Sequence, residues 1–113
     1  MIKISLDESY AYDLLAICEV KIKKKIKNAQ QNYSIIYNDI KNQIGNLHLD
    51  ILNSKEYLNL FKANLETFDA VEKARYGYIS AKEVDDLNMK RYNHKIALQN
   101  EFFSGTKILE YKT

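Results

Sequence analysis

The sequence predicts an all-α fold, in which a long N-terminal helix packs on an antiparallel hairpin of two helices. Apolar residues recur every three or four positions along most of the chain, which is the period of an amphipathic helix. There is no proline, and the three glycines, Gly45, Gly77 and Gly105, divide the chain into long segments. The 113 residues, 46% hydrophobic and with a net charge of +2, fit one helical domain over 1–113.

The first helix is expected over residues 6–44, and it would be about 58 Å long if it were straight. Ser5 and Glu8 fit a capping box, in which each side chain satisfies a backbone N–H of the other residue. The polar stretch around Asn28 is its weakest point. The apolar stripe repeats at nearly the period of a straight helix rather than a heptad coiled coil, at Ala11, Leu15, Cys18, Ile22, Ile26, Ala29, Tyr33, Ile36, Ile40 and Ile44.

The hairpin is expected over residues 55–76 and 81–104. Ser54 precedes the first of these helices as a candidate N-cap, and Gly77 follows it where a left-handed residue often ends a helix. Ser80 and Glu83 form a second candidate capping box, and Gly105 is expected to end the last helix. The short apolar segment 46–53 is ambiguous and is expected to form a turn against the bundle.

The helix at 81–104 carries two apolar stripes, separated by a polar seam of Asn88, Arg91 and Lys95. A helix with two stripes contacts two neighbours, which are either both of the other helices or one helix and another subunit. The stripes are Val84, Leu87, Leu98 and Phe102, and Met89, Tyr92, Ile96 and Phe103.

The hairpin is too short to cover the whole of a helix over 6–44. Either that helix breaks near Asn28 and folds back, or a second chain completes the three-helix bundle by sharing the exposed stripe. We favour the second, because exposed apolar surfaces of this size usually mark interfaces. The sequence therefore predicts a homo-oligomer, a dimer or larger, and the leading function is a structural or protein-interaction module that acts through self-association. This favours a protein that is not an enzyme, although an enzymatic role stays open.

Cysteine content and hydropathy predict a cytoplasmic protein, and no cofactor is expected. Cys18 is the only cysteine, so no intrachain disulfide can form and a reducing compartment is expected. No N-terminal apolar run precedes a cleavage site, and no window reaches the roughly 18 apolar residues of a membrane span. We therefore expect neither a signal peptide nor contact with a membrane, while a different protein partner stays open.

A basic run supports an alternative function, nucleic-acid binding. Its five lysines could contact phosphates, although on a continuous helix they would spread around most of the circumference. No aromatic or arginine side chain accompanies them within the run, so base stacking is not indicated there. The candidate residues are Lys21, Lys23, Lys24, Lys25 and Lys27.

A second alternative is a metal-dependent nucleotide hydrolase. Glu66, Asp69 and Glu72 are weak metal candidates, because their spacing is similar to the acidic pairs of the all-α nucleotide pyrophosphohydrolases. The E-x-x-E pair of that family is missing, however, and we favour helix-surface ion pairs with nearby cations as the explanation of these residues. Cys18 and the two histidines have no zinc-ligand spacing, so we expect no metal site.

Three segments resemble an uncharacterised family of small helical proteins, which is associated with bacterial surface-polysaccharide gene clusters and with viral and marine environmental sequences. Residues 4–21 resemble its opening, E-I-S-I-G-E-L-x-D-K followed by I-L-E-I-K. Residues 64–75 are similar to N-x-x-L-W-D-x-E-D-x-I-R, and residues 87–112 to L-N-D-x-R-A-x-x-K-x-x-I-N with an I-x-E-x-K-x-Y ending. The resemblance implies a helical fold but does not point to any particular activity. It draws attention to a polar network between the two hairpin helices, formed by Asp69, Glu72, Arg75, Asn88 and Arg91.

Overall fold

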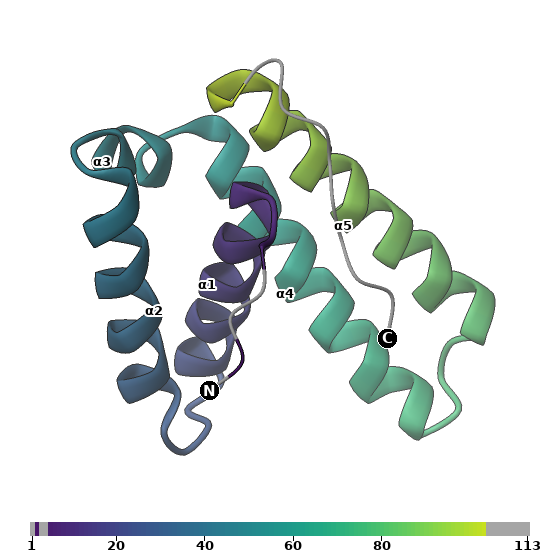
Figure 1. The fold of residues 1–113 in the computed structure, drawn as a ribbon. Helices are drawn as coiled ribbons and strands as arrows, with labels where there is room; N and C mark the ends of the chain where they lie inside the picture. Colours follow the sequence, from purple (N-terminus) through teal and green to yellow (C-terminus); the bar gives the residue numbers. More distant parts are fainter. Residues whose placement is uncertain (1, 3–4, 104–113) are drawn as a thin grey trace.

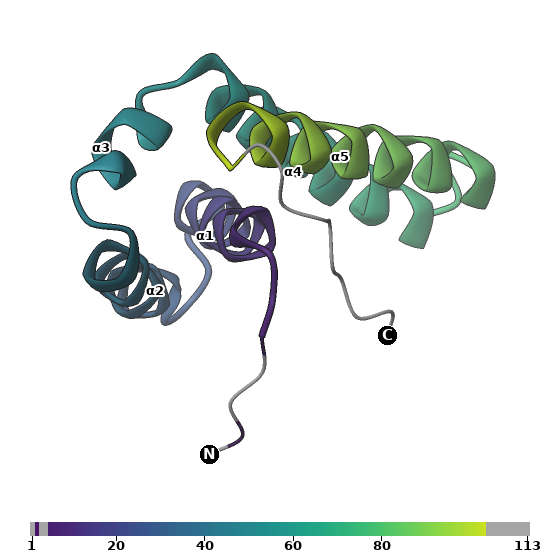
Figure 2. The same cartoon turned by 45° about the horizontal axis from the view of Figure 1, so that its top comes forward.

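The computed structural model describes residues 2 and 5–103, and within them the fold is a bundle of helices without strands. The helices are α1 (Glu8–Lys23), α2 (Ala29–Ile44), α3 (Leu47–Leu52), α4 (Lys55–Arg75) and α5 (Ala81–Phe102). The central helix is α1, with α2 on one side and the antiparallel pair α4 and α5 on the other (Figures 1 and 2). The all-α prediction is confirmed. None of the described helices has the length and apolar character required to cross a membrane.

The expected single helix over 6–44 is wrong, because the chain turns back between Lys24 and Asn28 and forms the separate helices α1 and α2. The backbone at Lys25 adopts a φ of 58°. Its N–H donates to the carbonyl of Ile22, and the N–H of Ile26 donates to that of Lys21. This pair of bonds is a Schellman motif, which usually has glycine at its left-handed position. Because this position holds a lysine rather than a glycine, the turn could not be predicted from the sequence.

The caps of the hairpin helices agree with the sequence, whereas the first cap does not. The hydroxyl oxygens of Ser54 and Ser80 accept hydrogen bonds from the backbone N–H groups of Tyr57 and Glu83, at 3.1 and 3.2 Å. Gly77 has a φ of 77° directly after α4, as expected. The capping box at Ser5 is wrong, because α1 begins at Glu8 after an extended N-cap, Asp7.

The hairpin helices end slightly earlier than predicted. The fourth helix ends at Arg75 rather than at residue 76, and α5 ends at Phe102. The expected stop at Gly105 lies outside the described residues. The ambiguous segment after Gly45 forms the short helix α3, which inserts Ile51 and His48 into the core.

The core forms where both faces of α1 meet its neighbours. The side chains of Tyr12, Leu15 and Ala16 on α1 are fully buried, together with Leu60 on α4 and Leu98 on α5. The second half of the apolar stripe, on α2, turns toward α1, so that Ile40 is also buried. The fold-back thus covers within one chain the stripe for which a second chain was expected.

Candidate functional site

The second stripe of α5 stays partly exposed on the described structure. Met89 is 59% exposed and Tyr92 is 38% exposed, and Ile96 on the next turn is half-buried. On the adjacent helix α1, Leu14 is exposed and Tyr10 is half-buried. We call these five residues the α1–α5 face.

A buried polar centre links Tyr10 and Tyr92 in this face. The ammonium group of Lys95, which is buried, lies 5.6 Å from the ring centroid of Tyr10 and 5.8 Å from that of Tyr92. Its Nζ atom is 3.7 Å from Oδ2 of the buried Asp13. A cation held between two aromatic rings favours one arrangement of both rings. Lys95 therefore holds the side chains of Tyr10 and Tyr92 in place.

Asp13 joins three helices through this centre. Its Oδ1 atom accepts a 2.9 Å hydrogen bond from Nδ2 of Asn64 on α4, and it lies 3.9 Å from Nε of Arg91 on α5. A carboxylate as buried as this one is tolerated only when it is paired and hydrogen-bonded. The centre holds α1 in register against the α4–α5 hairpin.

A shallow apolar groove of about 200 Å³ opens beside the centre. Arg91, Asn64 and Thr67 supply its polar lining. Its walls come from α1 and α4, at Ile17, Val20, Phe68 and Val71. The groove is therefore formed mainly by α1 and α4, and none of the five residues of the α1–α5 face lines it.

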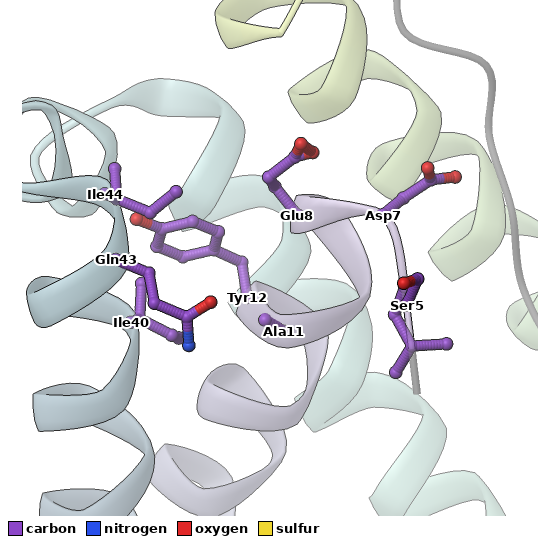
Figure 3. Close-up of a pocket in the computed structure, with 9 residues that line it drawn as sticks. Ser5, Asp7, Glu8, Ala11, Tyr12, Ile40, Gln43 and Ile44 are labelled. Carbon is purple, nitrogen blue, oxygen red and sulfur yellow. The ribbon is translucent and has the colours of Figure 1, made fainter. Parts of the chain in front are cut away.

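A larger pocket, of about 420 Å³, lies between the start of α1 and the end of α2. Figure 3 shows Ile40, Gln43 and Ile44 of α2 next to the ring of Tyr12. The carboxylates of Asp7 and Glu8 lie at the rim and point away from this ring (Figure 3). Because the two carboxylates do not converge on one point, the pocket does not offer a pair of groups for general acid–base chemistry.

Tyr12 and His48 form a buried hydrogen bond that connects α1 to α3. The phenol oxygen of Tyr12 is 2.8 Å from Nδ1 of His48, and both side chains are fully buried. The ring of Tyr37 meets that of His48 edge to face at 4.6 Å. The pKa of His48 is lowered, first by burial and then by the positive charge of Lys41. The imidazole is thus held neutral as part of the core.

The lysines of the basic run are all exposed, and they lie at the end of α1 and in the α1–α2 turn rather than around one long helix. We call Lys21, Lys23, Lys24, Lys25 and Lys27 the lysine bend. Lys24 forms an ion pair with Asp69 and lies 5.8 Å above the ring centroid of Phe68. These contacts fix the bend against α4.

The three acidic candidates for a metal site contact different cations. Glu66 pairs with Lys90 at 3.3 Å, Asp69 pairs with Lys24, and Glu72 pairs with Arg75 at 3.1 Å. Within residues 2 and 5–103, no three histidine, cysteine or acidic side chains lie close enough together to hold a metal ion. The sole cysteine, Cys18, is buried, and burial raises the pKa of its thiol.

The five residues suggested as a network are not brought together as one group by these contacts. Asp69 reaches across to α1, Glu72 and Arg75 pair within α4, and Arg91 faces Asp13. Asn88 is half-buried on α5. The centre that does form uses Arg91 together with residues that the sequence did not single out as partners, namely Asp13 and Asn64. Only the polar seam containing Arg91 and Lys95 indicated where it would lie.

Comparison of the chain with protein-family models, with curated proteins and with solved structures finds no match.

Proposed function

We propose that this chain is a small cytoplasmic protein-interaction module that self-associates through the α1–α5 face. The observation that carries the proposal is that Met89 and Tyr92, in the second stripe of α5, stay exposed, whereas Leu98 of the first stripe is fully buried. The apolar stripe over 6–44 is not available for this interface, because its α1 and α2 halves pack in the same core.

The composition and support of this face suit an interface. Tyrosine and methionine are enriched where proteins meet, and the face contains Tyr10, Tyr92 and Met89. Because Lys95, which pairs with Asp13, contacts the rings of both Tyr10 and Tyr92, little side-chain ordering would be required on binding. The occupant we propose is a second copy of the same face, related by a two-fold axis.

The test is the mass in solution over a range of concentrations, measured by sedimentation or light scattering. We expect wild-type protein to approach twice the 13.2 kDa of one chain. Replacing Met89 and Tyr92 with aspartate should give a monomer, because each change places a charge in the interface. Ile35→Asp is the matched control, since Ile35 is 54% exposed but lies on α2. A wild-type protein that stays monomeric at high concentration would refute the proposal.

Nucleic-acid binding is the second candidate function, and the geometry of the lysine bend favours it. The fold-back gathers the five exposed lysines at one end of the bundle, instead of distributing them around a rod. Clustered lysines release condensed counterions when they neutralise neighbouring phosphates, which is the main source of non-specific affinity.

Fluorescence anisotropy with labelled oligonucleotides at low salt tests this candidate. Lys23→Gln together with Lys27→Gln should weaken binding and reduce the slope of log K against log salt by about 0.7 per lost contact on single strands. Lys55→Gln together with Lys62→Gln is the control, because these exposed lysines on α4 remove the same charge at a different place. If both pairs of changes act equally, only net charge matters and the bend is not a site.

A further inference from the structure

Two tyrosines project from the turn between α4 and α5. Tyr76 is 71% exposed and Tyr78 is 77% exposed, and their ring centroids are 6.2 Å apart with an interplanar angle of 31°. Single exposed aromatic residues are common on protein surfaces. Here, however, two large rings lie next to each other and are both more exposed than any other tyrosine that the structure describes.

The backbone beneath these rings is fixed. The N–H of Gly77 donates to the carbonyl of Ala74, and the N–H of Tyr78 donates to that of Lys73, at 3.1 and 3.0 Å. These two bonds form a Schellman motif, and Gly77 occupies its left-handed position. The turn therefore presents the two rings from a set backbone rather than from a loose loop.

We call Tyr76, Gly77 and Tyr78 the tyrosine turn. This turn and the lysine bend lie toward the same end of the bundle. Figure 1 shows the α1–α2 and α4–α5 connections at its lower end, with the second half of α4 between them. The ion pair between Lys24 and Asp69 attaches the bend to α4, and Tyr76 follows Asp69 by two helical turns, or about 10 Å. Lys73, exposed in the last turn of α4, adds positive charge between them.

We propose that the tyrosine turn and the lysine bend together bind single-stranded nucleic acid. Bases stack on Tyr76 and Tyr78, while the lysines contact the phosphates of the same strand. Aromatic rings that are open to solvent can stack on unpaired bases, whereas the bases of a duplex are already stacked on each other. Positive charge beside such rings is the usual combination in proteins that bind single strands.

This inference rests on the second candidate function and adds to it a partner class and two residues. The experiment measures anisotropy of labelled DNA and RNA single strands of about 12 nucleotides, within the range of known single-strand sites. Duplexes of equal length serve as competitors. Binding of either strand type supports the proposal, and the tighter of the two identifies the preferred sugar. A duplex that competes as well as the single strand overturns it.

Variants separate stacking from charge. Tyr76→Ala with Tyr78→Ala should weaken single-strand binding about tenfold or more, the loss expected when stacking is removed. Tyr76→Phe with Tyr78→Phe should retain binding, because the phenyl ring keeps its stacking face. If the lysine changes weaken binding and the alanine changes do not, nucleic-acid binding stands and the stacking role is refuted. If wild-type protein binds no oligonucleotide at low salt, both fail.

A fluorescent side chain placed in the tyrosine turn tests contact with the strand independently of the binding affinities. The chain contains no tryptophan, so Tyr78→Trp supplies a single indole at the proposed site. Its fluorescence should be quenched on adding the single strand and should change little with the duplex. Unchanged fluorescence under conditions where anisotropy shows full binding would contradict contact at this turn.

Discussion

The turn that separates α1 from α2 leads to an unusual prediction, namely that glycine at position 25 will stabilise this protein. Lys25 has a φ of 58°, and a residue with a β-carbon in this left-handed conformation costs about 1–2 kcal/mol. Glycine removes that cost, but it also makes the unfolded chain more flexible, which offsets about 0.4–1 kcal/mol. Lys25→Gly should therefore raise the free energy of unfolding by roughly 0.5–1 kcal/mol.

Urea denaturation followed by circular dichroism measures this change in the free energy of unfolding. Its sign distinguishes the turn from a continuous helix. If residues 6–44 formed one continuous helix, glycine at position 25 would instead destabilise the protein by about 1 kcal/mol. Lys62→Gly is the control, since Lys62 is also an exposed lysine but lies in the interior of α4, and it should cost about 1 kcal/mol. Equal destabilisation by both substitutions would refute the turn.

Three further predictions concern the core and the caps. Because burial lowers the pKa of His48 below its ordinary 6.5, the unfolded chain binds the proton more tightly than the folded chain does. The free energy of unfolding should therefore fall below about pH 6.5, by up to ~1.4 kcal/mol per pH unit. His48→Phe should reduce the pH dependence of the urea midpoint measured between pH 5 and 8. Asp13→Ala removes the carboxylate beside Lys95 and should cost about 3–5 kcal/mol in urea denaturation, and a cost under about 1 kcal/mol would contradict its buried pairing. Ser80→Ala should lower thermal stability by about 1 kcal/mol while Ser5→Ala has almost no effect, and equal losses would contradict the assigned start of α1.

Local signals in the sequence determined the hairpin helices well. Ser54, Ser80 and Gly77 are residues whose side chains or backbone freedom suit one position at a helix end, and each occupies that position. Such signals depend on neighbours within four residues, so they can be read without knowing the rest of the fold.

The fold-back could not be read in the same way. Its turn contains neither glycine nor proline, and Lys25 and Asn28 adopt positive φ in their place. The apolar repeat also continues across the turn, because α1 and α2 both bury their stripes in the same core. Periodicity reports which side chains are buried, not whether the backbone between two buried residues is straight.

The polar centre depended on contacts that are distant in sequence. Arg91 and Lys95 stood out only as a seam between two apolar stripes, and nothing near Asp13 marked it as their partner. The same residue types, a carboxylate and a lysine or arginine, form buried ion pairs and the far more common exposed ones. Only the packing of α1 against α5 distinguishes them.

The central claim is that one chain covers its own long apolar stripe by folding back. The most direct test is the distance between spin labels at positions 6 and 43 in a Cys18→Ala background, measured by pulsed electron paramagnetic resonance. Leu6 and Gln43 line the same pocket, whereas a continuous helix would separate them by about 55 Å. We predict a single distance well under half of that, unchanged when labelled protein is diluted with unlabelled protein. A distance near the helical value, or a short one that disappears on dilution, would contradict the fold-back.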